Sequence, residues 1–192
     1  MNIAIFASGG GSNALEIIRR FREKGENGRV ALLVTDRTGT GAEVHARKYD
    51  IPSETVPPKT LRENPGELSD LLVRYGIDFI ALAGFLALIP AEVTRKFSGR
   101  MVNIHPSLLP DYGGKGMYGD RVHRAVLADG QRKTGITVHY VNEIYDDGEV
   151  IFQAETDVAE GETLESLKEK IRRLEHANYP RVIEECLKKL QI

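Results

Sequence analysis

The chain has 192 residues, of which 41% are hydrophobic and 28% are charged, and its formal net charge is −2. These values are typical of a soluble globular protein, and we expect residues 1–192 to form a single domain. The near-neutral charge gives no electrostatic reason to expect nucleic acid or an acidic membrane surface as a partner, and no apolar run approaches the roughly 20 residues that span a bilayer.

Strand-like and helical segments alternate along the first half of the chain. Short apolar runs rich in β-forming residues predict strands, and apolar residues at helical spacing predict the helices between them. In chain order, the expected elements are a strand over 3–7, a helix over 14–24, a strand over 29–35, a helix over 41–50, a short strand over 53–56, a helix over 67–76, a strand over 78–84, a helix over 90–97 and a strand over 100–105. This alternation predicts a Rossmann-like, doubly wound α/β fold with a mostly parallel sheet.

The pattern changes in the last third of the chain. Two strand-like segments, 134–142 and 149–158, are joined by the acidic, Gly-containing turn 143–148, so we expect them to pair in antiparallel fashion. A long helix over 163–190 then closes the chain, and Pro180 should kink or split it.

The single cysteine, Cys186, lies on the apolar face of that last helical segment and is expected in the core. It has no partner for an internal disulfide. The N-terminus also lacks the basic segment and apolar core of a signal peptide, so the sequence predicts a cytoplasmic protein.

Three stretches follow expected parallel strands, namely 8–13, 84–89 and 103–110. In open α/β sheets, ligands bind beyond the carboxyl ends of such strands. The first stretch is Gly-rich, which lets backbone N–H groups approach an anion at the positive end of the following helix. Ser12 and Asn13 add side-chain hydrogen bonds, so this loop predicts a phosphate site.

The same loop leaves other interpretations open. Gly9, Gly11 and Ala14 satisfy the G-x-G-x-x-A pattern of dinucleotide-binding proteins, and Asp36 lies about where a ribose-binding acid should follow. An NAD-dependent oxidoreductase is therefore an alternative, although the chain shows no obvious second domain for a substrate. A non-catalytic phosphoribosyl-binding module and a tight turn without a ligand are also open.

The end of the strand over 100–105 carries two candidate catalytic side chains. Residues two apart in a strand point the same way, so Asn103 and His105 should project side by side before Pro106 redirects the chain. Such a pair of donors suits a carbonyl that becomes an oxyanion. The imidazole can also carry a proton near neutral pH.

No metal site is expected. The candidate ligands His105, His123, His139 and Asp146 do not follow the spacing of known metal-binding motifs.

Four segments together resemble the folate-dependent formyltransferases. NIHPSLLPDYGGKG (103–116) resembles the active-site segment of that family, and MNIAIFASGGGSN (1–13) resembles its phosphate loop. IALAGFLALIP (80–90) is similar to its folate-pocket strand and loop, and EHANYP (175–180) to its C-terminal segment. The resemblance covers nearly the whole chain and is greatest to members whose acceptor is glycinamide ribonucleotide.

The resemblance implies a reaction and its substrates. The formyl group of 10-formyltetrahydrofolate would pass to the amine of N1-(5-phospho-D-ribosyl)glycinamide, a step of de novo purine biosynthesis. The amine would attack the formyl carbon directly, while the Asn103 amide and a protonated His105 stabilise the oxyanion. Asp146 would keep His105 charged or correctly oriented. Small molecules are the expected partners, and a monomer and a homodimer are both open.

The resemblance also implies site residues by position. The catalytic residues are Asn103, His105 and Asp146, with Asp146 preferred to its neighbour Asp147 because it matches the spacing of the family. The acceptor-binding residues are Gly11, Ser12, Asn13 and Glu175. The residues that hold the folate are Arg62, Leu86, Ala87, Leu88, Ile89, Asn103, Asn142, Glu143, Ile144, Tyr145 and Asp146.

The chain departs from the family pattern at three places. Ala87 stands where many members have a polar or basic residue, and Arg172 stands where some have Gln. The segment 111–123 is longer and richer in glycine than in the best-studied members. Within it, Lys115 and Tyr118 are candidates for a ligand contact, and a mobile solvated loop is the other interpretation.

Overall fold

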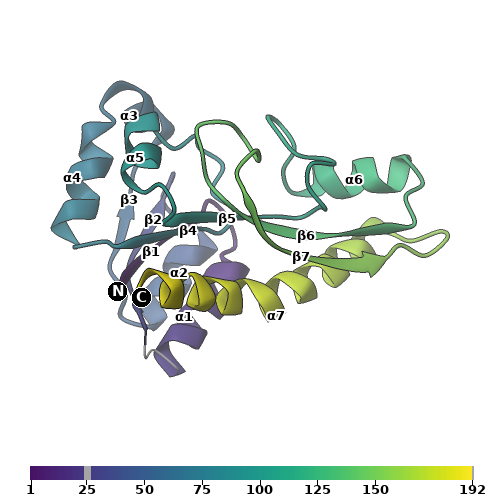
Figure 1. The fold of residues 1–192 in the computed structure, drawn as a ribbon, viewed down its shortest axis with the longest axis horizontal. Coiled ribbons are helices and arrows are strands. Elements are labelled where there is room, and N and C mark those ends of the chain that lie inside the picture. The colour runs from purple at the N-terminus through teal and green to yellow at the C-terminus, as the bar shows by residue number, and fades with distance from the viewer. Residues whose placement is uncertain (24–26, 192) are drawn as a thin grey trace.

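Seven strands form one sheet in the computed structural model, which describes residues 1–23 and 27–191 (Figure 1). The strands are β1 (Asn2–Phe6), β2 (Arg29–Thr35), β3 (Ser53–Thr55), β4 (Phe79–Leu82), β5 (Met101–His105), β6 (Lys133–Tyr140) and β7 (Val150–Asp157). They lie in the order β3-β2-β1-β4-β5-β6-β7. The strands β1 to β5 pair in parallel, whereas β6 and β7 are antiparallel to their neighbours. The predicted mostly parallel sheet with antiparallel C-terminal strands is confirmed.

Helices cover both faces of the parallel part of the sheet (Figure 1). They are α1 (Ser12–Glu23), α2 (Gly41–Lys48), α3 (Pro58–Glu63), α4 (Gly66–Arg74), α5 (Ala91–Lys96), α6 (Asp120–Ala128) and α7 (Leu164–Leu190). One core joins α1, α2 and α7 to one face, and a second joins α3, α4 and α5 to the other. Both cores are possible because side chains alternate along a strand, so Ile3 and Ile5 enter the first core while Ala4 and Phe6 enter the second.

Two helices were not predicted from the sequence. The helix α3 has six residues, of which only Leu61 is buried, so its sequence carries no helical periodicity. The helix α6 begins after Gly119, which provides no side-chain cap, and its first residues lie in the Gly-rich segment 111–123, for which the sequence predicts no helix. The predicted end of the first helix at Lys24 and the final residue Ile192 lie outside the described residues.

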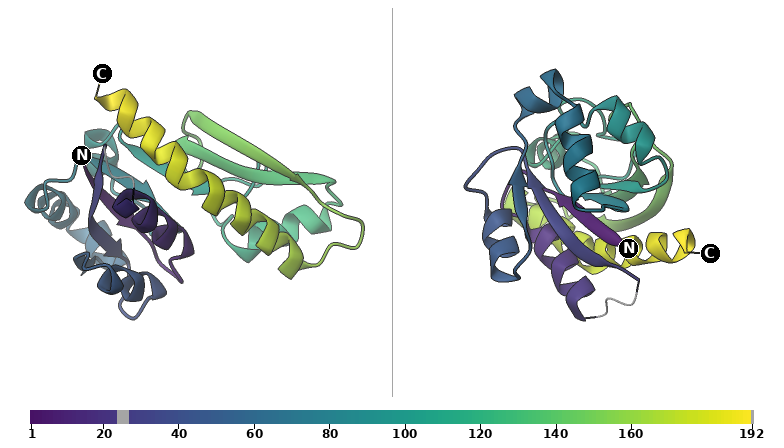
Figure 2. Two further views of the ribbon diagram at one scale, coloured as in Figure 1. Left: turned by 90° about the horizontal axis from the view of Figure 1, so that it is seen from below. Right: turned by 90° about the vertical axis from the view of Figure 1, so that its left-hand side faces the viewer.

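The C-terminal helix α7 is continuous through Pro180, so the predicted split there is wrong. Figure 2 shows it running beside β6 and β7 and back toward the N-terminal strands. Tertiary contacts outweigh the missing backbone hydrogen bond, because Tyr179, Pro180 and Val182 are all buried. The Tyr179 hydroxyl donates to the carbonyl oxygens of Leu82 at 2.8 Å and Val102 at 3.2 Å. Cys186 is buried in the same core, as predicted. Over the described residues, no helix is long and apolar enough to cross a membrane.

The strand order reverses between β1 and β4, because the chain goes on from β1 to β2 and β3 on one side and from β4 to β5 on the other. At such a point the loops that leave the two strands turn in opposite directions and open a crevice. Here the two loops are tied together at their bases. The Ser8 amide donates to the Gly84 carbonyl at 3.0 Å, and the Leu86 amide donates to Ser8 Oγ at 2.9 Å.

Candidate active site

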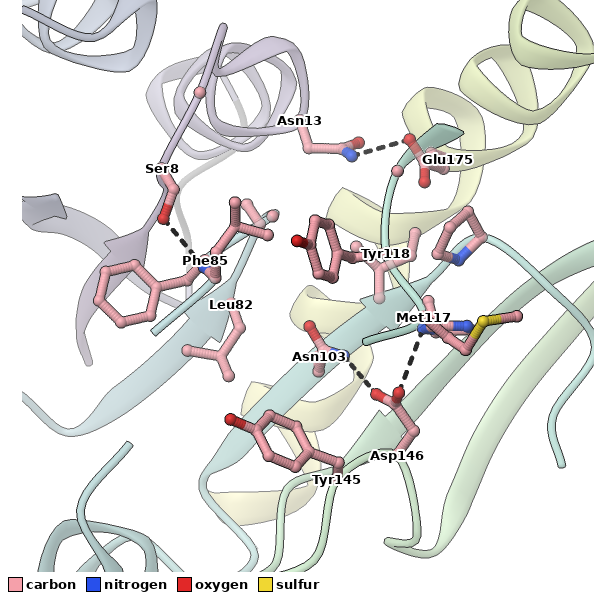
Figure 3. Close-up of a pocket in the computed structure, with 18 of the residues that line it drawn as sticks. Ser8, Asn13, Leu82, Phe85, Asn103, Met117, Tyr118, Tyr145, Asp146 and Glu175 are labelled. Carbon is pink, nitrogen blue, oxygen red and sulfur yellow. Dashed lines mark hydrogen bonds and ion pairs between the residues drawn. The ribbon is translucent and has the colours of Figure 1, made fainter. Parts of the chain in front are cut away.

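A cavity of about 690 Å³ lies at the reversal point, beyond the carboxyl ends of β1, β4 and β5 (Figure 3). All three stretches that the sequence placed there line it, namely residues 8–13, 84–89 and the start of 103–110. The segment 114–120, the turn before β7 and the first half of α7 complete the wall. Its size suits a small-molecule site.

One end of the cavity is lined by the loop between β1 and α1. Gly11 has a φ of +73°, and a Cβ there would lie 2.5 Å from Ala42 Cα, so only glycine fits. The Ala42 amide donates to the Gly9 carbonyl at 3.2 Å and fixes the loop further. Among the described residues, the backbone N–H groups of 10–13 donate to no protein acceptor. These free donors at a helix N-terminus can bind an anion.

Glu175 on α7 faces this loop. Its Oε2 accepts a hydrogen bond from Asn13 Nδ2 at 2.9 Å (Figure 3). Burial raises the pKa of Glu175 to about 7, although the hydrogen bond from Asn13 lowers it in part. Within the described chain, Asn13 Oδ1 is buried without a hydrogen-bond partner. The predicted acceptor-binding residues Gly11, Ser12, Asn13 and Glu175 therefore line one end of one cavity.

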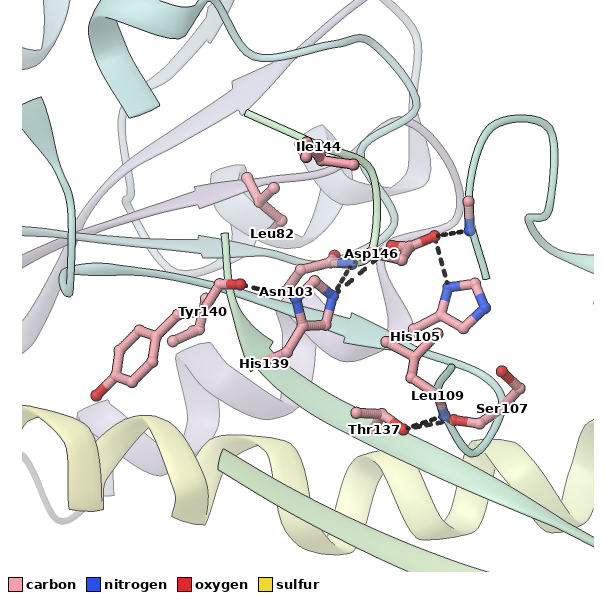
Figure 4. A network of polar contacts seen from close by, with 12 residues as sticks. Leu82, Asn103, His105, Ser107, Leu109, Thr137, His139, Tyr140, Ile144 and Asp146 are labelled. Atoms are coloured by element: carbon pink, nitrogen blue, oxygen red, sulfur yellow. Dashed lines mark hydrogen bonds and ion pairs between the residues drawn. The ribbon is translucent and has the colours of Figure 1, made fainter. Parts of the chain in front are cut away.

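The predicted catalytic residues meet in the middle of the cavity (Figure 4). Asn103 and His105 leave the same side of β5, and both reach the carboxylate of Asp146. Asn103 Nδ2 lies 3.5 Å from Asp146 Oδ1, and His105 Nδ1 lies 3.5 Å from Asp146 Oδ2. The turn after β5 is fixed from β6, because Thr137 Oγ1 donates to the Ser107 carbonyl at 2.7 Å.

His139 on β6 orients the Asn103 amide, a role that the sequence analysis missed. The two residues face each other in the antiparallel register of β5 and β6. His139 Nδ1 lies 2.8 Å from the Tyr140 carbonyl and so carries the hydrogen, which leaves Nε2 to accept from Asn103 Nδ2 at 3.1 Å. One amide hydrogen of Asn103 is thus engaged, and the other makes only the long contact with Asp146. Only the pairing of distant strands could have identified His139.

The His105 imidazole is buried, and both its nitrogens face protein groups. Nε2 donates to the Tyr112 carbonyl at 2.8 Å, so the lone pair of the neutral ring is on Nδ1, facing Asp146. Burial lowers the pKa of His105 below its usual range, and the charge of Asp146 raises it only in part. Desolvation thus affects this pKa more than the charge of Asp146 does, and the expectation that Asp146 keeps His105 charged or correctly oriented stays a prediction.

Asp146 lies in the turn between β6 and β7 with a φ of +54°. Its Oδ2 accepts from the Gly114 amide at 2.8 Å, which ties the glycine-rich segment to the catalytic cluster. Burial raises the pKa of Asp146, but the contact with His139, the charge of His105 and the Gly114 N–H outweigh it, so the pKa lies below its usual range. Asp147 is exposed and accepts instead from Asn142 Nδ2 at 3.4 Å. The geometry therefore favours Asp146 over Asp147 as the carboxylate that accompanies Asn103 and His105.

The other end of the cavity is apolar. Leu86, Leu88, Ile144 and Tyr145 line it and are 45%, 55%, 65% and 41% exposed, respectively. Ala87, Ile89 and Asn142, which were also predicted to hold a folate, line the cavity as well.

Two predicted folate residues do not line the cavity. Glu143 pairs with Arg95 at 2.8 Å, and Arg62 on α3 lies 3.8 Å from Glu63. A contact between either residue and a ligand that extends beyond the cavity stays a prediction. Asp36, on which the dinucleotide alternative relied, is also absent from the cavity wall and lies 3.9 Å from Arg37 Nε.

The fold and the cavity define a class of Rossmann-like α/β protein. Its cluster of Asn103, His105 and Asp146 lies between two ends of one cavity: the end at residues 10–13 and Glu175, here named the anion-binding end, and the apolar end at residues 86–89 and 144–145. Residues 1–183 match the family described as formyl transferase, and the chain belongs to that family.

Individual relatives agree with this assignment. The chain is 45% identical over 186 residues to a chloroplastic phosphoribosylglycinamide formyltransferase from Arabidopsis thaliana. The aligned region covers 94% of this chain and 63% of that relative. It is 38% identical over 188 residues to phosphoribosylglycinamide formyltransferase from Bacillus subtilis (strain 168), and this alignment covers 96% of this chain and 93% of that relative. Glycinamide ribonucleotide transformylase 1 from Symbiobacterium toebii superimposes with a TM-score of 0.90 at 32% identity over 98% and 88% of the two chains. The chain spans about three fifths of the length of the plant relatives it matches.

Proposed function

We propose that this protein, as one domain over 1–192, transfers the formyl group of 10-formyltetrahydrofolate to the amine of N1-(5-phospho-D-ribosyl)glycinamide. One observation carries the proposal. A single cavity connects the free N–H groups of 10–13 to an apolar end, and Asn103, His105 and Asp146 lie between them. A phosphorylated acceptor suits the first end, and the flat pterin ring of a folate suits the second.

The side chains support direct transfer. The acceptor amine attacks the formyl carbon, a new C–N bond forms, and the carbonyl oxygen becomes an oxyanion. Asn103 can donate to that oxygen with the hydrogen that makes only a 3.5 Å contact with Asp146. The bond to the leaving folate nitrogen then breaks, and the proton lost by the amine ends on that nitrogen.

His105 is suited to carry this proton. In its neutral form Nε2 donates to Tyr112, so Nδ1 is the nitrogen that accepts. Asp146, 3.5 Å away, stabilises the imidazolium while it exists. A lowered pKa is an advantage here, because the free enzyme then holds the imidazole in the neutral, proton-accepting form at neutral pH.

A direct assay tests the proposal. The protein is mixed with 10-formyltetrahydrofolate and the phosphoribosyl glycinamide, and both the formylated product and tetrahydrofolate are measured. We expect the two products in equal amounts and little tetrahydrofolate when the acceptor is omitted. Release of tetrahydrofolate that does not depend on the acceptor would contradict transfer and indicate hydrolysis.

Two further measurements address the alternatives. NAD is titrated in parallel, and saturable NAD binding without formyl transfer would favour the oxidoreductase. Full activity after dialysis against a chelator is expected, because we propose that no metal takes part. Among the described residues, no three His, Cys, Asp or Glu side chains are grouped so as to hold a metal ion. The cytoplasmic location and the choice between monomer and homodimer stay predictions.

A further inference from the structure

Tyr118 is directed into the cavity from the segment in which the chain departs from its family pattern (Figure 3). In that view it lies between the pair Asn13–Glu175 and Asn103. The side chain is 45% exposed. Its hydroxyl makes no hydrogen bond with any residue that the structure describes, so both the ring and its polar tip are open to a ligand.

The backbone around Tyr118 is arranged to present this ring. Gly116 and Gly119 flank it with φ values of +90° and +54°, which other residues rarely adopt. The Arg121 guanidinium carbon lies 5.0 Å from the ring centroid, and the Arg121 amide donates to the Tyr118 carbonyl at 3.2 Å. Arg121, which does not line the cavity, thus supports a ring that does.

Both ends of the segment are attached to the cavity wall. At its start, the Gly114 amide donates to Asp146 Oδ2 at 2.8 Å. At its end, Asp120 pairs with Lys168 on α7 at 2.7 Å. These two contacts fix the segment to the catalytic cluster and to the helix that carries Glu175. The position of Tyr118 is therefore defined relative to both.

We propose that Tyr118 recognises the central part of the acceptor, with its ring packed on the ribose and its hydroxyl bonded to a polar group of the ribose or glycinamide. This inference rests on the proposed function. An acceptor whose phosphate is held by residues 11–13 and whose amine reaches His105 must place its sugar and glycinamide in the space between these groups. Tyr118 borders that space.

The test compares two tyrosines of the same cavity. Tyr118→Phe and Tyr118→Ala are measured against Tyr145→Ala, whose ring lies at the apolar end. Binding of the phosphoribosyl glycinamide alone is followed by calorimetry, KM is determined for both substrates, and thermal unfolding confirms that each variant is folded. Asn13→Ala serves as a positive control for weakened acceptor binding.

Loss of one neutral hydrogen bond should weaken acceptor binding by roughly 3- to 10-fold in Tyr118→Phe. Removal of the ring in Tyr118→Ala should weaken it by more than about 10-fold, with the folate KM unchanged in both variants. Tyr145→Ala should instead raise the folate KM and leave acceptor binding unchanged. Wild-type acceptor binding in both Tyr118 variants, or an equal loss for both substrates, would overturn the inference while the proposed function stands. A wild-type protein that neither binds nor formylates the acceptor would overturn both.

Discussion

The two ends of the cavity differ in how far each is formed before a ligand arrives. At the anion-binding end, Gly11 is locked against α2, Asn13 is bonded to Glu175, and the free donors are rigid backbone N–H groups. At the apolar end, the side chains of Leu86, Leu88 and Ile144 stand exposed. A compact charged group gains most from donors that are already oriented, whereas a flat apolar ring gains from surface that it covers. Under the proposed function, the acceptor would be recognised by preorganised polarity and the folate by burial of apolar surface.

If the two ends of the cavity bind the two substrates, the cluster of Asn103, His105 and Asp146 between them should contribute to the reaction and not to substrate binding. His105→Ala should reduce kcat by about a hundredfold or more, because a positioned side chain that transfers a proton in the transition state contributes about 10²–10⁴-fold. Both substrates should bind as in the wild type, since neither end of the cavity contains this imidazole. Calorimetry with each substrate and steady-state kinetics provide the measurement. A parallel loss of affinity for either substrate would contradict the division.

Asp146→Asn should reduce kcat by about tenfold or more and change its pH dependence. In the proposed mechanism the neutral imidazole of His105 is the active form, so activity should rise with pH through the pKa of His105. The charge of Asp146 raises that pKa, and its removal should move the rise to lower pH. The pH profile of kcat/KM provides the measurement.

Two variants serve as controls for this change. Asp147→Asn, at the neighbouring exposed position, should keep the wild-type pH profile of kcat/KM. The double change with His105→Ala should cost less than the sum of the single losses, because Asp146 acts through His105. Additive losses of activity would show that Asp146 does not act through His105.

Asn13→Ala should affect the anion-binding end alone. One or two lost charge-assisted hydrogen bonds cost roughly 1.5–3 kcal/mol each, so acceptor affinity should fall by at least about tenfold. Folate affinity should be unchanged, because the proposed folate site lies at the other end of the cavity. Separate binding titrations with the two substrates decide the matter. A variant that loses folate affinity and keeps acceptor affinity would reverse the assignment of the two ends.

Glu175 makes the stability of the anion-binding end depend on pH. Burial raises its pKa from an ordinary 4.5 to about 7, so between these values the folded protein holds a proton that the unfolded chain has lost. Its contribution is fully present below pH 4.5 and is lost as the pH rises through about 7, by roughly 1–3 kcal/mol. Glu175→Gln should remove this slope from denaturant-unfolding free energies measured across the range. Glu185→Gln, on an exposed face of the same helix, should retain it.

Leu88→Ala should produce the smallest effect and at the opposite end. The side chain is 55% exposed in the free protein, so a bound folate can cover only about half of its surface. Removal of that contact should cost about 1 kcal/mol, which raises the folate KM by about fivefold and leaves acceptor binding intact. Val73→Ala, at a position on α4 that is 64% exposed and outside the cavity, is the matched control. Equal effects of the two changes on folate KM would remove the distinction between the ends.

Much of the fold could be predicted from local patterns. Alternating apolar runs and helical spacings in the first 105 residues identified the parallel strands and most of their helices, because each pattern repeats within a few residues. The Gly-rich loop was found for the same reason, since the donors of 10–13 and the helix that follows are contiguous. Helix α3 was missed because it has six residues and buries only Leu61. Helix α6 was missed although it buries Val122, His123 and Val126, because its start lies in the Gly-rich segment 111–123.

The sequence by itself determined the sheet class, the anion-binding loop and the pair Asn103 and His105, because each depends on residues that are neighbours in the chain. Tertiary structure alone decided that His139 orients Asn103, that α7 passes through Pro180 unbroken and that burial keeps the pKa of His105 low. These features depend on strand register and on packing between segments far apart in sequence. The free energy of desolvation or of a hydrogen bond is set by what surrounds a group in space, and a list of residues does not contain those distances.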